Sequence, residues 1–161
     1  MTDVLPSRSS SAPDAGLLFV RAVDGPDELA VHHRMRTAVF VNEQGLFAPD
    51  DRDVHDDDPF TVHVLGSVGA EPAGAVRLYP LGGSAWKGDR LAVLPPYRRS
   101  RIAGRLVRFA VATAAERGGT RMDALVQTAN VRFFLSLGWS AVGEPHDLLG
   151  LPHQPMTIAL R

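Results

Sequence analysis

The sequence contains no cysteine, which excludes disulfide bonds, catalysis by a thiolate and zinc sites built on cysteine. Positive and negative side chains nearly balance, since the formal net charge is −1, so no overall field attracts nucleic acid or a membrane surface. No apolar run approaches the roughly 18–20 residues that span a bilayer. These absences favour a cytoplasmic protein that binds neither nucleic acid nor a membrane.

Composition and hydrophobic periodicity predict the organisation of the chain. Residues 1–15 are rich in Ser, Pro and Ala and lack an apolar signal core, which predicts a flexible tail. Residues 16–161 suit one domain with one core. The apolar patterns predict the order β (17–23), α (28–41), β (61–69), β (73–81), β (86–96), α (100–117), β (121–128), α (129–138) and two final strands. This order, β-α-βββ-α-β-α-ββ, indicates an α/β domain built on a mixed sheet.

An unusual run of arginines marks the start of the second long predicted helix. Residues 97–108 read YRRSRIAGRLVR, with five arginines close to the helix N-terminus. A helix N-terminus already carries partial positive charge and unpaired N–H groups, so further cations there indicate a site for an anion. The forked donors of arginine suit phosphate. A solvated basic helix face is the alternative, but the position after an apolar strand and a short turn favours a diphosphate ligand.

The segment RLAVLPPYRRSRIAGRLVRFAVATAAERG resembles the acetyl-CoA-binding segment of the GNAT N-acetyltransferase superfamily. That family has an apolar strand, an Arg/Gln-x-x-Gly-x-Gly/Ala turn and a long helix. Arg98 matches the first position of the turn and Ala103 the last, whereas Arg101 replaces the middle glycine. Arg101 would either contact the coenzyme or block its site. The blocks RTAVFVNEQGLF, LVQTANVRFFLSLGW and GLPHQPM resemble further segments of this family, in the same order.

The resemblance implies a GNAT-like fold in which two central strands separate and admit the pantetheine arm of acetyl-CoA. A backbone N–H near Val93 would then stabilise the oxyanion that forms during acetyl transfer to an amine. Asn130 has the alternative role of capping the short helix. The coenzyme-binding residues implied in this way are Leu91, Ala92, Val93, Arg98, Arg99, Ser100, Arg101, Ile102, Ala103, Gly104, Arg105, Gln127, Asn130 and Phe133.

Transfer to an amine requires a group that removes a proton before the amine attacks. His153, Glu43 and His63 are the candidate bases, although a lone histidine in a strand is more often structural. Arg36, Gln44 and Glu144 are the candidate acceptor-binding residues, with partnership to the acidic loop as the alternative for Arg36.

One catalytic group that the resemblance implies, a proton donor for the leaving thiolate, is absent from its expected position in the sequence. The family usually protonates the leaving thiolate with a tyrosine on the short helix, and Phe134 stands at that position. Tyr97, another donor or water would replace the tyrosine, or the thiolate would leave without a proton.

The segment APDDRDVHDDDP concentrates aspartates between the first helix and the next strand. Carboxylates and one histidine are potential metal ligands, but the order of an EF-hand is absent and clustered aspartates usually form a solvated loop, so we expect no metal site.

Two functions remain open for the chain. The first is an acetyl-CoA-dependent N-acetyltransferase acting on a primary amine of a small molecule. The second is a non-catalytic module that binds coenzyme A or a partner protein, which Arg101 and Phe134 favour. RTAVFVNEQG also resembles, more loosely, the homoserine-lactone synthase branch. A homodimer is compatible with the sequence, which leaves the oligomeric state open.

Overall fold

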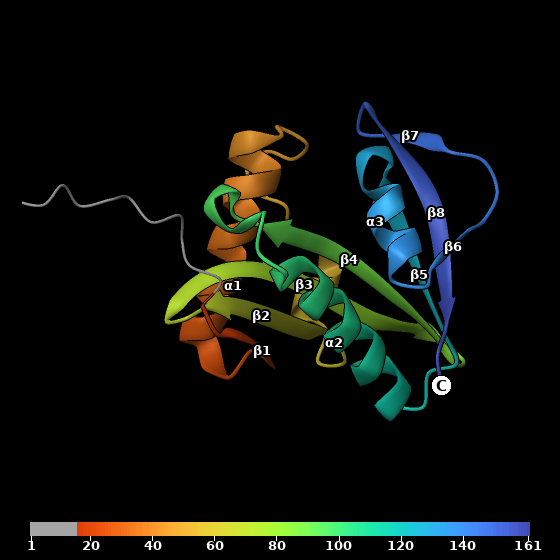
Figure 1. Ribbon diagram of the computed structural model, residues 1–161, viewed down its shortest axis with the longest axis horizontal. Coiled ribbons are helices and arrows are strands. Elements are labelled where there is room, and N and C mark those ends of the chain that lie inside the picture. The colour runs from red at the N-terminus through yellow and green to blue at the C-terminus, as the bar shows by residue number, and fades with distance from the viewer. Residues whose placement is uncertain (1–15) are drawn as a thin grey trace, which may run out of the picture.

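A mixed sheet of eight strands runs through residues 16–161, the part of the chain that the computed structural model describes (Figure 1). The predicted tail at 1–15 lies outside the described residues. The strand order is β1-β2-β3-β4-β5-β8-β6, and β7 pairs with β8. The strands are β1 Leu18–Ala22, β2 Val62–Val68, β3 Glu71–Gly82, β4 Ala85–Val93, β5 Arg121–Gln127, β6 Ser140–Ala141, β7 His146–Leu148 and β8 Leu151–Ala159.

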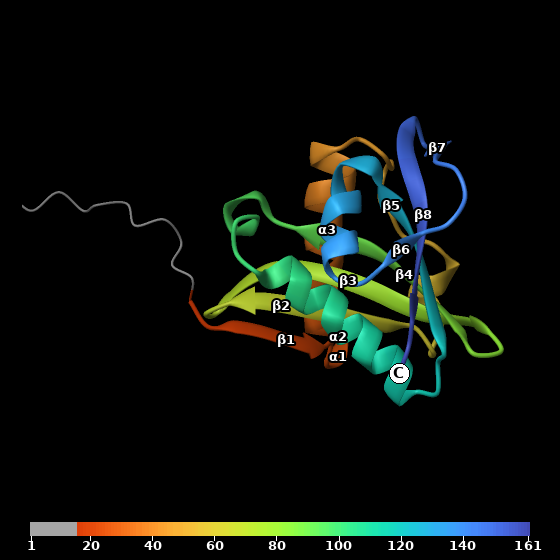
Figure 2. The same cartoon turned by 45° about the vertical axis from the view of Figure 1, so that its right-hand side comes forward.

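Helices cover both faces of the sheet (Figures 1 and 2). Helix α1 (Gly25–Arg36) continues as a π-helix (Thr37–Glu43) on one face, and α2 (Ile102–Glu116) packs on the other. Helix α3 (Val131–Ser136) follows β5. The predicted order of strands and helices is confirmed, with the short strand β6 as an addition. None of the helices in the described range combines the length and the apolar character needed to cross a bilayer.

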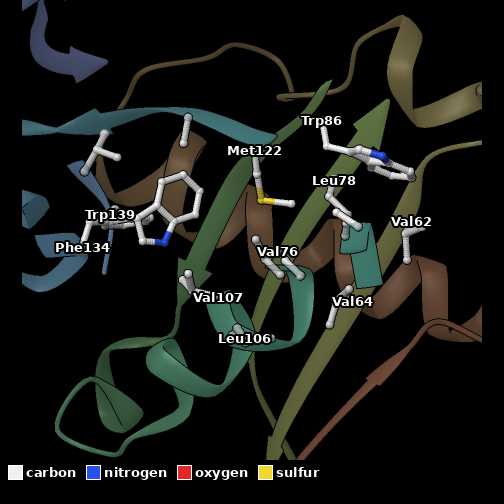
Figure 3. Packing of buried hydrophobic residues seen from close by; sticks show 14 of the residues in the cluster. Val62, Val64, Val76, Leu78, Trp86, Leu106, Val107, Met122, Phe134 and Trp139 are labelled. Atoms are coloured by element: carbon white, nitrogen blue, oxygen red, sulfur yellow. The ribbon is translucent and has the colours of Figure 1, made fainter. Parts of the chain in front are cut away.

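The main hydrophobic core lies between α2 and the sheet (Figure 3). Ile102, Leu106, Ala110 and Ala114 form the buried stripe of α2, as the helical periodicity predicts. The helix approaches the sheet closely at Gly66, where an added Cβ would lie 2.8 Å from the Ile102 side chain. Glycine at this position therefore sets the depth at which α2 packs.

The central strands β4 and β5 separate after a short stretch of parallel pairing. Only three residue pairs join them, and the last is Lys87 with Asp123. Beyond this pair, β4 contains a bulge, with Arg90 in a left-handed conformation at φ 53°. A bulge bends its strand and increases the local twist. The two strands diverge visibly in Figure 1, so the predicted splayed pair is confirmed.

The acidic segment folds onto the face of the sheet that α1 covers, where it neutralises two fully buried arginines. Arg36 donates to Asp51 at 2.7 Å and to both oxygens of Asp56 at 2.7 and 3.1 Å. Arg77 in β3 donates two hydrogen bonds to the Asp53 carboxylate, at 2.7 and 3.0 Å, and two to the Asp89 carboxylate, both at 2.8 Å. The expectation of a solvated acidic loop is therefore wrong for Asp51, Asp53 and Asp56, whereas Asp50, Asp57 and Asp58 are exposed.

Three histidines pack beside this network. His32 and His33 are buried in α1, and their rings lie 4.9 and 5.9 Å from the ring of His63. Burial lowers the pKa of His32 to about 3. Burial, assisted by the nearby Arg36 and Arg52 charges, lowers the pKa of His33 to about 4. Both histidines are therefore neutral in the folded protein at neutral pH.

These two histidines predict a loss of stability in mild acid. An unfolded histidine takes up a proton near pH 6.5, whereas the folded protein excludes it until about pH 3 or 4, so stability falls as pH drops below 6.5. We expect the free energy of unfolding to fall by roughly 3 to 4 kcal/mol between pH 7 and 5. Urea denaturation at several pH values measures this fall.

The variant His32→Gln should lose about half of that pH dependence, because glutamine keeps an N–H donor for the Val76 carbonyl and does not titrate. His146→Gln, at an exposed position, is the matched control and should keep the full dependence. Equal pH dependence in His32→Gln and the wild type would contradict the assignment.

Candidate functional site

A groove of about 740 Å³ lies where the end of β4, the following turn, the start of α2 and helix α3 meet. We call it the groove. Its lining contains most of the residues that the sequence predicted for coenzyme binding. The lining residues are Val39, Gln44, Leu91, Val93, Arg98, Ser100, Arg101, Ala103, Gly104, Arg108, Gln127, Asn130, Phe133 and Leu137.

The turn before α2 directs unpaired amides at the groove. Ser100 Oγ donates to the Tyr97 carbonyl at 2.6 Å and accepts from the Ile102 N–H at 3.3 Å, which fixes the entry of the chain into the helix. Arg101 occupies the N-cap position. The N–H groups of Ala103 and Gly104 fall in the first turn, where a helix offers them no carbonyl partner. These amides and the flanking arginines suit an anionic group.

Arg98 joins the groove to the end of the π-helix. Its guanidinium donates to both carboxylate oxygens of Glu43, and its Nε donates to the Val93 carbonyl at 3.0 Å. The hydrogen bonds from Arg98 hold the pKa of Glu43 below its usual value. Glu43 lies outside the lining of the groove and is a poor proton acceptor in this arrangement, so it does not suit the role of base that the sequence suggested.

The edge of β4 that faces β5 offers free backbone groups beyond the point of separation. The Leu94 N–H donates to the Ala73 carbonyl on the β3 side at 2.9 Å. Because successive amides of a strand point to opposite edges, the amides of Val93 and Leu91 point toward β5. The parallel pairing has already ended at Lys87, so these amides are available to a ligand that enters the gap.

A second space, of about 160 Å³, continues from the groove through the gap between β4 and β5. We call it the inner cavity. Leu91, Gln127 and Asn130 line both spaces and so mark their junction. The other lining residues are Phe40, Leu46, Phe47, Val76, Lys87, Gly88, Asp89, Arg90, Val107, Ala110, Met122, Ala124, Leu125, Val126, Phe134, Trp139, Leu148, Leu149 and His153.

The inner cavity also contains a histidine in a defined tautomer. His153 in β8 is buried, and its Nδ1 lies 2.7 Å from the Leu151 carbonyl. A carbonyl oxygen only accepts hydrogen bonds, so Nδ1 carries a proton, and in the neutral form of the ring Nε2 keeps a free lone pair. A neutral imidazole of this kind is able to accept a proton from a bound amine.

Several predicted residues lie away from both spaces. His63 lies outside both linings and bonds to Asp56 at 3.0 Å, and Glu144 is exposed on the loop after β6. Arg36 is fully buried and committed to the aspartates, so it does not suit acceptor binding, and its alternative role as a partner of the acidic loop is the one observed. Gln44, by contrast, lines the groove and accepts from Gln127 at 3.0 Å.

The coenzyme set also contains residues that line neither space. Ala92 and Ile102 are buried in the core, whereas Arg99 and Arg105 are exposed.

Histidines and an aspartate also cluster on the α1 face, outside both spaces. His33, Asp56 and His63 offer potential metal ligands within 4.8 Å of one another. The Asp56 carboxylate already accepts from Arg36, and a further arginine, Arg77, lies 3.0 Å away. Burial alone would raise the pKa of Asp56, but the hydrogen bonds from His63 and Arg36 hold it well below its usual range. The cluster is thus a hydrogen-bonded ion network, and we assign no metal to it.

The α1-side wall of the inner cavity was not predicted from the sequence. Lys87 and Asp89 line it, and their alternation with Trp86 and Gly88 in β4 was a signal that they face away from the main core. Phe40 and Phe47 complete this side, and only the tertiary fold brings them to β4.

Comparison with known proteins agrees with this architecture. The model of the acetyltransferase (GNAT) family matches residues 29–139. A provisionally assigned acetyltransferase of Bacillus subtilis strain 168 is 28% identical over 142 residues, which cover 86% of this chain and 94% of that protein.

Solved structures show the same fold. A provisionally assigned N-acetyltransferase from Lactobacillus plantarum superposes with a TM-score of 0.80 at 24% identity, over 89% of this chain and 99% of that one. BjaI, a coenzyme A-dependent acyl-homoserine lactone synthase solved with SAM and isopentyl-CoA, superposes with a TM-score of 0.76 at 21% identity, over 89% of this chain and 84% of that one.

The structural role of Arg36 predicts a large effect on stability. In the variant Arg36→Met, Asp51 and Asp56 lose a buried partner, and breaking such a pair costs about 3–5 kcal/mol. Arg34→Met, at an exposed position of the same helix, should change stability by less than about 0.5 kcal/mol. Urea denaturation of both variants at pH 7 measures the difference. Similar stability of the two variants would mean that the network contributes little to the fold.

Proposed function

Because the chain belongs to the GNAT acetyltransferase family, we propose that it transfers the acetyl group of acetyl-CoA to a primary amine of a small molecule. One observation carries this proposal. The groove with its arginines and helix amides continues, through the gap between β4 and β5, into a cavity that contains His153. An anion site, an open strand edge and a proton acceptor thus lie in series, in the order that the parts of the coenzyme and the amine require.

The residues of the groove fit the anionic end of coenzyme A. Arg98 and Arg101, with the Ala103 and Gly104 amides, would hold the diphosphate. Arg101 lines the groove without closing it, which supports a role in binding over a blocking role. The amides of Leu91 and Val93 would pair with the pantetheine arm along the open edge of β4, and Gln127 and Asn130 at the junction offer further polar groups.

The chemistry requires three actions from this chain. Bound acetyl-CoA supplies an acetyl group activated as a thioester. His153 Nε2 would take the proton of the attacking amine. The Val93 N–H would donate to the carbonyl oxygen as negative charge develops on it. Neutral acceptor amines would enter from the side of the exposed Leu148 and Leu149, at the turn between β7 and β8.

The leaving sulfur has no hydroxyl donor beside it. Among residues 16–161, the lining of the inner cavity contains no Ser, Thr or Tyr, and Phe134 presents a buried ring there. Tyr97 packs against the core and lies outside both linings. A thiol with a pKa of about 8.5 is a good enough leaving group to depart as the thiolate. Transfer through this site therefore proceeds without a tyrosine acid.

The role of Arg101 predicts a measurable loss of coenzyme affinity. Arg101→Ala removes a charge-assisted contact, which we expect to weaken coenzyme A binding by about 10- to 100-fold. Isothermal titration calorimetry with coenzyme A measures this loss. Arg105→Ala, at an exposed position of the same helix outside the groove, is the matched control and should bind within about twofold of wild type. Equal affinity of the two variants would remove Arg101 from the site.

The role of His153 predicts a loss of turnover. His153→Gln should lower kcat by about 10²- to 10⁴-fold, the usual contribution of a general base, with coenzyme A affinity retained. Release of free thiol from acetyl-CoA against a panel of small amines measures turnover. Undiminished kcat in His153→Gln would exclude this residue as the base. Coenzyme A binding by the wild type without turnover of any amine would support the non-catalytic module instead.

A further inference from the structure

The inner cavity has two sides of different chemistry, separated by the plane of the sheet. On the α1 side, the charged or polar groups of Lys87, Asp89, Arg90 and His153 line it together with apolar side chains, among them Phe40 and Phe47. On the α2 side, its lining residues belong to the main hydrophobic core. We call this second side the apolar half and define it by Val76, Gly88, Val107, Ala110, Met122, Ala124, Val126, Phe134 and Trp139.

Small residues keep the apolar half open. Gly88 leaves β4 without a side chain there, and an added Cβ would lie 3.3 Å from Met122 Sδ. Ala110 on α2 and Ala124 on β5 also contribute short side chains. The rings of Phe134 and Trp139 have their centroids 5.3 Å apart, and Figure 3 shows both rings to one side of Met122. The aromatic pair forms a rigid wall against which an apolar ligand can pack.

The phenylalanine at 134 is part of this character. A tyrosine would place a hydroxyl among buried apolar groups, whereas the Phe134 ring adds no polar atom to the wall. The wall also carries the indole N–H of Trp139, a buried donor without a partner. A protonated acceptor amine would lose its hydration in the apolar half without gaining a side-chain acceptor, which makes the α1 side its entrance. The apolar half suits a hydrocarbon group, but an acetyl group has only one methyl group to place there.

We propose that the apolar half binds the hydrocarbon chain of an acyl-CoA donor longer than acetyl-CoA, with up to about six carbons in the acyl group. This inference rests on the proposed function, because it places the thioester in the gap between β4 and β5. The junction at Leu91, Gln127 and Asn130 joins the groove to the inner cavity, of which the apolar half is part, so we expect one ligand to reach both. An acyl chain that turns from the gap toward α2 leaves the polar side free for the amine.

The volume of the cavity sets the chain length. The whole inner cavity encloses about 160 Å³. A cavity of about 150 Å³ in an engineered protein core takes up benzene, which has six carbons. Because the apolar half is only part of this volume, about six carbons is the upper limit for the acyl chain.

The reaction with a longer acyl-CoA follows the same steps as the transfer of an acetyl group. The amine nitrogen attacks the thioester carbon, a C–N bond forms and the C–S bond breaks. The amine proton passes to His153 Nε2, and the sulfur leaves with the bonding electrons as the thiolate of coenzyme A. The products are an N-acyl amide and free coenzyme A.

Calorimetric titration of the wild-type protein with coenzyme A and with acetyl-, butyryl-, hexanoyl- and octanoyl-CoA tests the proposal. Each buried methylene should tighten binding about three- to fourfold, so we expect hexanoyl-CoA to bind on the order of 50-fold or more tighter than acetyl-CoA. The gain should stop between hexanoyl and octanoyl, where the cavity is full.

Two variants on α2 test whether the acyl chain lies in the apolar half. Ala110→Leu fills the apolar half, so the advantage of hexanoyl-CoA over acetyl-CoA should fall to below about fivefold. Ala112→Leu, at an exposed position of the same helix, is the control and should keep the wild-type advantage. Circular dichroism melting checks that both variants are folded. If Ala110→Leu does not fold, the titration of the wild-type protein with the series of acyl-CoA thioesters tests the proposal.

The outcomes separate this inference from the proposed function. Binding of coenzyme A and acetyl-CoA with no more than a threefold gain for hexanoyl-CoA would overturn the acyl-chain proposal alone. An unchanged ratio of hexanoyl-CoA to acetyl-CoA affinity in Ala110→Leu would overturn it too, because the acyl chain would then lie outside the apolar half. Failure of coenzyme A and of every thioester to bind would overturn both proposals.

Discussion

The separation of β4 from β5 is the constraint from which the rest of the site follows. Three parallel pairs hold the strands together, and beyond Lys87 the bulge at Arg90 turns β4 away. Strand amides left without a partner are costly unless water or a ligand bonds to them. The gap therefore creates both an opening through the sheet and a row of free donors along its edge. The groove and the inner cavity meet at this gap.

The buried ion network stabilises this geometry. Arg90 carries a left-handed backbone that an arginine rarely adopts, and its side chain donates to the Asp51 carboxylate at 3.0 Å while it packs over the Phe47 ring at 4.5 Å. Asp51 is in turn held by Arg36. The acidic loop thus supports the bulge from outside the sheet, and its charges shape the site without lining the groove.

The sequence was sufficient for the fold and for the location of the groove, because both depend on local patterns. Alternating and helical periodicities predicted the order of elements, and the arginine-rich turn lies between a strand and a helix that are adjacent in the chain. The role of Arg36 was not predictable in the same way, since its partner Asp51 is 15 residues away in an irregular loop. The two sides of the inner cavity depend on residues from β4, α2, β5 and α3, and no local pattern reports how much space they leave.

The proposed function requires that coenzyme A binds along the open edge of β4. Amide hydrogen exchange followed by NMR, with and without coenzyme A, tests it directly. The account predicts slower exchange at Leu91 and Val93 and in the first turn of α2, with unchanged exchange in β1 and β2. Unchanged exchange at Leu91 and Val93 in the presence of saturating coenzyme A would contradict it.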